Sequence, residues 1–400
     1  MMTKQAIVKV SSTSFLFFAL LSVLFLYVAH RITTSDAAYP SGCGRWSVVK
    51  SFDPGTTQNG FNSVSAISTN DVWAVGSQAT HSASQTLIEH WNGSTWSVVK
   101  SPNPSSTVNS LNGVAAISNN DVWAVGTSDD SHARTHQTLI EHWNGSGWSV
   151  VSSPNQGQWS VLNSVTAISV SDVWAVGYAV SGNQSVHSTL IEHWNGTIWS
   201  IITSPNQGTN TNVLSSITAI SANDLWTVGQ YVLGNDLNPQ TLIEHYNGNT
   251  WTIVVSPNIK AMENGLSGVT AVSSHDIWAT GTAFNLPGNT SQTLIEHYNG
   301  STWTIVASPN ARSSQNFLHG VTAISARDIW AVGLSITNTG VRKTLIEQWN
   351  GSTWRIVSSP SPGSDLNSLD SITRVPTTGQ IWAVGSYKTN SDRTLTQFYC

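Results

Sequence analysis

Glutamate and histidine recur side by side along the chain and are the first residues to consider for chemistry. The dipeptide begins at Glu89, Glu141, Glu192, Glu244 and Glu296. Carboxylate and imidazole groups are common metal ligands. Neighbouring residues of a strand point to opposite faces of a sheet, however, so one Glu-His pair cannot chelate one ion. We therefore expect no metal and no cofactor, and we expect each histidine to bond to a polar group of the adjacent repeat unit.

An enzyme that cleaves glycosidic bonds would need carboxylates outside the repeated positions, because its general acid and its general base must have different pKa values. The aspartate two residues before a tryptophan occurs six times, from Asp71 to Asp328, and suits a capped turn. The acids outside the repeat pattern are Asp53, Asp129, Asp130, Asp236, Glu263, Asp365, Asp370 and Asp392. None stands in a catalytic motif. The sequence therefore favours a non-catalytic binding protein, with a glycoside hydrolase or lyase as the alternative.

Aromatic side chains outside the repeated positions are the candidate ligand contacts. Aromatic faces combined with neutral amides and hydroxyls suit a sugar, and aromatic residues are also enriched where proteins meet. The candidate binding residues are Trp159, Tyr178, Tyr231, Phe284 and Tyr387, with Arg134 and Arg342 nearby. The partner is expected to be a glycan or a surface protein. The 16 Lys and Arg are scattered and the net charge is −5, so nucleic acid is not an expected partner.

The elements that must position these residues repeat at intervals of about 52 residues. The repeated tryptophan stands at Trp73, Trp123, Trp174, Trp226, Trp278, Trp330 and Trp382. In the first full unit the predicted strands are 64–67, 72–76, 87–91 and 95–99. Asn92-Gly93 predicts a tight hairpin between the last two strands. Such units predict an all-β fold, a seven-bladed β-propeller of four antiparallel strands per blade over 43–400, with tryptophans between the blades.

The two ends of the repeat region complement each other. Residues 45–50 match a fourth strand, and residues 394–400 match a third strand that lacks its successor. The N-terminal strand is therefore predicted to complete the last blade, in a three-plus-one arrangement. The only two cysteines, Cys43 and Cys400, fall where the missing hairpin turn would be. A disulfide there is predicted, as suits an exported protein in an oxidising environment.

The connections between strands differ in how much they vary. Antiparallel order places the loops after the second and the fourth strand on one face, and these loops change from unit to unit. The short turns on the opposite face barely change. Variation on one face is typical of a recognition surface on a rigid scaffold, although drift in solvated loops would give the same pattern. We expect a monomer that binds its ligand on the variable-loop face.

Residues 1–38 differ in composition from the repeats. Lys4 and Lys9 precede an apolar run over 15–29, and small residues follow it. This order is typical of a signal peptide, and an uncleaved N-terminal anchor is the alternative. The lysines favour a cytoplasmic N-terminus, so the repeats are expected to be secreted or at the cell surface. The membrane would be contacted only through this segment.

The predicted hairpins resemble part of the Asp-box, Ser-x-Asp-x-Gly-x-Thr-Trp, of sialidase-like propellers. Gly93-Ser94-Thr95-Trp96 matches its end, and so do residues 300–303 and 351–354. The serine and aspartate of the box are replaced here by glutamate and tryptophan. The resemblance implies a propeller but does not supply the arginines, tyrosine and acids of a sialidase site. The chain also resembles exported bacterial repeat proteins and, more distantly, tectonin-type lectins, which implies a binding scaffold.

Overall fold

The computed structural model describes residues 43–80, 82–130, 135–182, 186–234 and 238–400. Contacts divide the chain into Met1–Tyr39 and Pro40–Cys400, and the described residues belong to the second unit. The expected signal or anchor at 1–38 lies outside them. Within the described residues, no helix is long and apolar enough to cross a membrane. The regular elements of this part are 28 strands.

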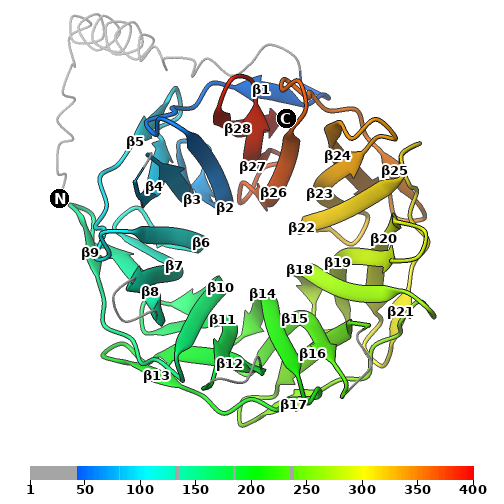
Figure 1. The fold of residues 1–400 in the computed structure, drawn as a ribbon, viewed down its shortest axis with the longest axis horizontal. Helices are drawn as coiled ribbons and strands as arrows, with labels where there is room; N and C mark the ends of the chain where they lie inside the picture. Colours follow the sequence, from blue (N-terminus) through cyan, green and yellow to red (C-terminus); the bar gives the residue numbers. More distant parts are fainter. Residues whose placement is uncertain (1–42, 81, 131–134, 183–185, 235–237) are drawn as a thin grey trace, which may run out of the picture. The chain divides into compact units, whose positions relative to one another are not determined.

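The strands are grouped in fours, and neighbours within each group pair antiparallel (Figure 1). The last group takes β1 as its fourth strand, and single parallel residue pairs link β4 to β6 and β8 to β10. The innermost strands are β2 (Gln58–Ser68), β6 (Val108–Ser118), β10 (Trp159–Ser169), β14 (Thr211–Ser221), β18 (Glu263–Ser273), β22 (Gln315–Ser325) and β26 (Asn367–Arg374). The second strands are β3 (Asp71–Ala79), β7 (Asp121–Asp130), β11 (Asp172–Val180), β15 (Asp224–Val232), β19 (Asp276–Asn285), β23 (Asp328–Ile336) and β27 (Ile381–Lys388). This arrangement of sheets around a central channel is a β-propeller, and the 28 strands fit seven blades of four.

The outer half of each group is a hairpin. The third strands are β4 (Ser84–Trp91), β8 (Thr135–Trp143), β12 (His187–Trp194), β16 (Gln240–Tyr246), β20 (Thr290–Tyr298), β24 (Arg342–Trp349) and β28 (Asp392–Tyr399). The outermost strands are β5 (Trp96–Val98), β9 (Trp148–Val150), β13 (Trp199–Ile201), β17 (Trp251–Ile253), β21 (Trp303–Ile305), β25 (Trp354–Ile356) and β1 (Ser47–Val49). Each outermost strand has three residues, so little unpaired edge is presented to other chains.

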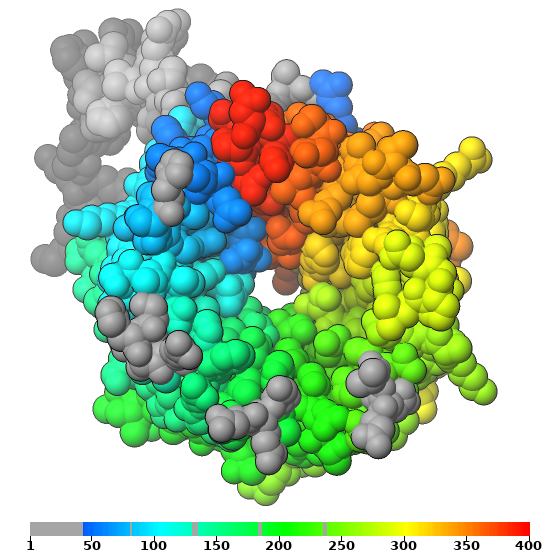
Figure 2. Space-filling model, in the orientation of Figure 1, coloured from blue at the N-terminus to red at the C-terminus, as the bar shows by residue number. Residues whose placement is uncertain are grey.

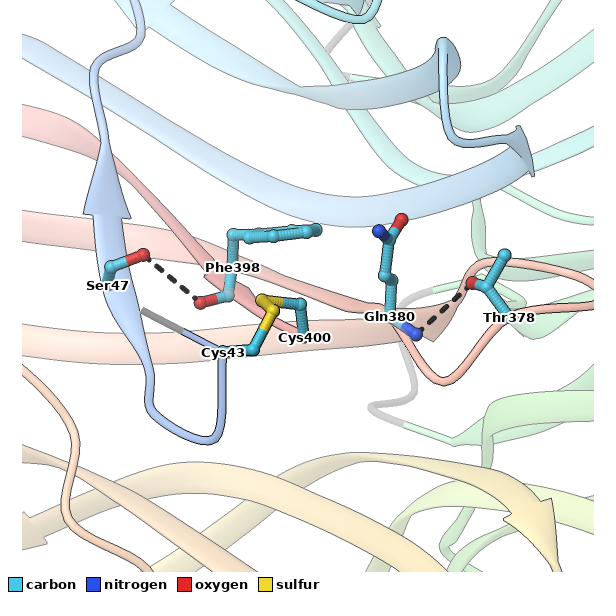
Figure 3. Close-up of a disulfide and its surroundings, with 6 residues drawn as sticks. All are labelled: Cys43, Ser47, Thr378, Gln380, Phe398 and Cys400. Atoms are coloured by element: carbon cyan, nitrogen blue, oxygen red, sulfur yellow. Dashed lines mark hydrogen bonds between the residues drawn. A yellow bond between two sulfur atoms is a disulfide. The ribbon is translucent and has the colours of Figure 1, made fainter. Parts of the chain in front are cut away.

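The two termini meet in one sheet, as predicted. β1 pairs antiparallel with β28, with Ser47 opposite Phe398, and completes the order β1-β28-β27-β26. Figure 3 shows the disulfide between Cys43 and Cys400 beside the bond that Ser47 Oγ donates to the Phe398 carbonyl. The predicted pairing of the two cysteines is therefore confirmed. It joins residues 357 positions apart in the sequence.

The innermost strands are longer than predicted. The first covers Gln58–Ser68, whereas the sequence predicts only 64–67. Its first half is polar, and the buried Asn59 bonds to the backbone at Gly55. A search for apolar alternation misses such a segment. The second and third strands are also longer than predicted, since β3 ends at Ala79 and β4 begins at Ser84, so the loop between them is shorter than expected.

Each innermost strand carries a bulge at the same place. In β2 the register against β3 shifts between Phe61 and Ser63, so Asn62 is an extra residue. The glycine of β3 beside this point is required by space, since a Cβ on Gly76 would lie 2.0 Å from the Gly60 carbonyl oxygen. The bulge therefore explains why the repeated phrase contains a glycine, and it places one additional side chain per strand toward the channel.

The repeated tryptophans fill the interfaces between sheets, as expected. The ring centroid of Trp73 on β3 lies 5.2 Å from that of Trp143 and 5.5 Å from that of Trp148, both in the following sheet. Trp73 is 2% exposed. Edge-to-face packing of such large rings stabilises the contact beyond area burial alone. These tryptophans are scaffold, because no ligand can reach them in the folded chain.

The histidine prediction is wrong. His90 Nε2 lies 2.8 Å from Asp71 Oδ1 of its own sheet, not of the adjacent unit. His90 pairs directly with Trp73 in the β3–β4 register, so both rings lie on one face, and they approach to 4.4 Å. Trp73 Nε1 donates to the same carboxylate oxygen at 3.0 Å. The aspartate therefore does more than cap a turn, because it holds two ring N–H groups.

Loss of one such aspartate should destabilise the fold. Asp172 accepts from Trp174 Nε1 at 2.7 Å and bonds to His193 at 2.8 Å, so we expect Asp172→Ala to cost about 1–3 kcal/mol. Asp328 offers a matched control, since Gln348 Nε2 donates to it at 2.8 Å while the buried Trp330 Nε1 makes no hydrogen bond. Urea denaturation of Asp328→Ala should show a smaller loss. Equal losses would contradict the assignment of two bonds to Asp172.

Candidate ligand-binding site

Two predicted aromatics lie on one sheet at the variable-loop face. Trp159 is the first residue of β10, is 41% exposed, and meets His136 edge to face at 4.9 Å. Tyr178 on β11 stacks on His187, with centroids 5.1 Å apart and planes 14° apart. Burial raises the pKa of Tyr178, so its phenol remains a neutral hydrogen-bonding group. Trp159 thus lies partly exposed at this rim.

The other predicted residues are not gathered with these two. Tyr231 and Tyr387 are partly buried in hydrophobic cores between sheets, because their positions on the second strands face a neighbouring sheet. Arg342 begins β24 and has an exposed side chain, while its backbone N–H donates to the Asp365 carbonyl. Arg134 lies outside the described residues. The predicted set is therefore spread over several sheets and does not form one cluster.

Phe284 lies in the wall of a cavity of about 410 Å³, between β14, β18 and β22. Glu263 stands directly opposite it in the β18–β19 register. Phe317 on β22 supplies a second aromatic ring, and Gln230 and Thr282 supply an amide and a hydroxyl. The volume falls within the ~300–1,000 Å³ of small-molecule sites. Aromatic faces and a few convergent polar groups are the arrangement that such sites use.

The walls of this cavity are held by specific contacts. The buried Asn264 donates from Nδ2 to the Ile259 and Met262 carbonyls at 3.0 and 2.7 Å, which fixes the segment leading to Glu263. A Cβ on Gly265 would lie 2.7 Å from Gln230 Oε1, so the glycine lets this amide approach the cavity. The walls of this cavity, which we call the loop-face cavity, are therefore held in place by the protein itself.

A second cavity, of about 220 Å³, lies in the central channel, and Figure 2 shows the hollow in the space-filling view. Ser215 and Ser267 line both cavities, so the two adjoin. The channel wall also contains His319 and Asp370, whose side chains lie 3.0 Å apart. Sequence reasoning noted Asp370 only as an unrepeated acid and missed His319. The sequence signal that could have identified His319 is its place at the bulge of an innermost strand, where five of the seven units have asparagine or serine.

The repeated glutamates are not candidates for binding or catalysis. All six are fully buried, and burial is the main cause that raises the pKa of each to about 8. They are Glu89, Glu141, Glu192, Glu244, Glu296 and Glu347. The seventh position has Gln397, a neutral side chain that is equally buried. Within the described residues, no group of three or more His, Cys, Asp and Glu could hold a metal ion.

The fold places the chain among β-propeller proteins. No protein-family model matches the sequence, and a comparison with curated proteins finds no match. Solved structures of similar fold include YCF48 bound to D1 peptide (TM-score 0.54, 13% identity, covering 90% of this chain and 98% of that one). A PL25 ulvan lyase matches with TM-score 0.55 and 9% identity over 88% of this chain and 95% of its own. The GH74 xyloglucanase from Xanthomonas campestris matches with TM-score 0.53 and 8% identity, over 86% and 54%.

Proposed function

We propose that this chain is a non-catalytic binding module, a seven-bladed β-propeller that recognises a glycan on its variable-loop face. The grouping of 28 strands in fours and the pairing of β1 with β28 support the blade count and the closure. The observation that carries the function is the loop-face cavity, which is lined by two aromatic rings together with an amide, a hydroxyl and a carboxylate. A sugar presents C–H groups to aromatic faces and hydroxyls to polar groups, which matches this lining.

The acids of the chain support binding rather than catalysis. The repeated aspartates hold tryptophan and histidine rings, and the repeated glutamates are buried. Asp53 bonds to Arg393 at 3.2 Å and accepts the Thr394 N–H at 2.7 Å, so it serves the closure of the last sheet. Glu263 and Asp370 remain as acids that line the two adjoining cavities. A glycoside hydrolase or lyase acting in these cavities would use these two acids, which makes it the second candidate.

An extracytoplasmic location is part of the proposal. The disulfide between Cys43 and Cys400 suits an oxidising compartment, since cytosolic thiols are kept reduced. The basic and apolar order of residues 1–38 supports export through a signal peptide or retention by an anchor. Solved propellers of similar fold include one bound to a peptide and one that is a polysaccharide lyase bound to its polysaccharide, so a surface protein is the alternative partner.

A glycan array tests the proposal directly. We expect the folded chain to bind neutral oligosaccharides and Phe284→Ala to weaken that binding about 3–10-fold, through loss of an aromatic contact. Trp159→Ala, at the exposed rim, should also weaken binding. Ile198→Ala is the matched control, because Ile198 is 59% exposed but lies in a turn of the opposite face.

Three results would redirect the interpretation. A blank array together with hydrolysis of a chromogenic glycoside would favour the enzyme. A blank array with capture of a defined peptide would favour a protein partner. Equal weakening by Phe284→Ala and Ile198→Ala would remove the variable-loop face as the site.

A further inference from the structure

The bulged residue of each innermost strand lines the central channel. These residues are Asn62, Asn112, Asn163, Ser215, Ser267, His319 and Asp370. Five of the seven are asparagine or serine. The last two are ionisable and lie on neighbouring strands, β22 and β26. Of the residues that line the channel cavity, only these two are ionisable.

His319 takes over a structural task that asparagine performs elsewhere. Asn62 Nδ2 donates to the carbonyl of Leu111 on the next innermost strand at 2.8 Å, and the bulged asparagines of β6 and β10 do the same. His319 Nδ1 makes the equivalent bond to the Leu369 carbonyl at 3.1 Å. Asparagine would suffice for this bond. The imidazole therefore brings a second ring nitrogen, Nε2, into the channel, and the scaffold does not require this atom.

The contacts of His319 fix which nitrogen carries the proton. A carbonyl oxygen can only accept, so Nδ1 must be the donor to Leu369, and Asp370 Oδ1 lies 3.0 Å from the same nitrogen. Ser368 Oγ donates to Asp370 Oδ1 at 2.6 Å and holds the carboxylate. Burial alone would lower the pKa of His319, but the bond and charge of Asp370 with the Leu369 carbonyl raise it. Nε2 is left for a ligand.

We propose that His319, positioned by Asp370, binds a hydroxyl of the terminal sugar of a neutral glycan whose remaining units occupy the loop-face cavity. This inference rests on the proposed function. A hydroxyl both donates and accepts, so it satisfies Nε2 in either protonation state. The His319 imidazolium and the Asp370 carboxylate are together neutral, so the channel wall presents no net charge that would select an anion or a cation. At about 220 Å³ the channel cavity is below the ~300 Å³ of typical sites, so it holds an end group rather than a whole ligand.

His319→Asn separates binding from structure, because asparagine keeps the bond to the Leu369 carbonyl but lacks Nε2. We expect an unchanged melting temperature and a 3–10-fold weaker affinity for neutral trisaccharides of xylose, glucose or galactose, measured by calorimetry. Asp370→Asn removes the charge that raises the His319 pKa, so the pH at which the His319 ring titrates should fall. Imidazole ¹⁵N NMR would follow that titration and the response of His319 to each sugar.

The outcomes distinguish this inference from the proposed function. Weakening by both Phe284→Ala and His319→Asn, with a shift of the His319 signals on sugar addition, supports both. Sugar binding that depends on Phe284 but leaves the His319 signals unmoved and His319→Asn unaffected overturns the channel subsite alone. No sugar response in either assay overturns both.

Discussion

Replacing both Cys43 and Cys400 with serine should lower the free energy of unfolding by as much as about 5–6 kcal/mol, since the disulfide closes a loop of more than 350 residues in the unfolded chain. This is an upper figure because residual structure in the unfolded chain reduces the gain. Without the disulfide, the first strand is held by three register pairs with β28 and by the Trp46 side chain. Calorimetry should show a melting temperature lower by as much as about 7–8 °C.

The natural chain and the double serine variant, compared with and without a reductant, control for this prediction. A reductant should lower the melting temperature of the natural chain toward that of the double serine variant and leave the variant itself unchanged. Trp46→Ala, with the disulfide intact, tests the other half of the closure, because Trp46 is 4% exposed and packs 5.7 Å from Trp330. A double serine variant as stable as the natural chain would show that β1 closes the sheet without covalent help.

The second large effect is a loss of stability as pH rises. The glutamates have an ordinary pKa of 4.5 and a pKa of about 8 in the folded chain. Below pH 4.5 both states hold these protons. Between pH 4.5 and about 8 the unfolded chain loses protons that the folded chain retains, so the unfolded state is favoured progressively. Urea denaturation at pH 5, 7 and 9 should show stability falling across this window and levelling above it.

Glutamine substitution identifies the cause. Gln397 occupies the same position in the last sheet, where its Nε2 donates to the Pro360 carbonyl at 2.8 Å. Glu192→Gln should therefore raise stability at pH 9 by about 1–3 kcal/mol and have little effect at pH 5. Glu89→Gln is the contrasting variant and should gain less, because the Phe52 N–H donates to that carboxylate at 3.1 Å. Parallel pH profiles for the natural chain and Glu192→Gln would contradict the account.

The sequence predicted the β-propeller, the closing strand and the disulfide because each depends on local, repeated signals. Asn92-Gly93 specifies a hairpin, and the ends of the chain can be aligned to the repeat without coordinates. The polar start of the strand at Gln58 could not be predicted from apolar alternation, since its buried side chain, Asn59, bonds to backbone groups. The pairing of His90 with Asp71 required the cross-strand register.

The candidate site was predicted less completely than the fold. The burial of Tyr231 and Tyr387 depends on which side of a second strand meets the next sheet, and no single unit of sequence contains that information. Phe284 was identified, but its cavity is lined by strands of three repeat units, which lie about 50 residues apart along the chain. The contact between His319 and Asp370 likewise joins two repeat units.

The bulge in each innermost strand has a consequence for how this scaffold can acquire new ligands. An inserted residue such as Asn62 has no partner in the β2–β3 register, and its exposed side chain bonds to the Leu111 carbonyl of the next strand, whereas the preceding Phe61 is buried in the core. A change there alters the wall of the channel while leaving the cores between sheets intact. The seven bulged residues of the innermost strands are thus positions that can be substituted one at a time. A library randomised at these positions alone should yield new binding specificities without unfolding the propeller.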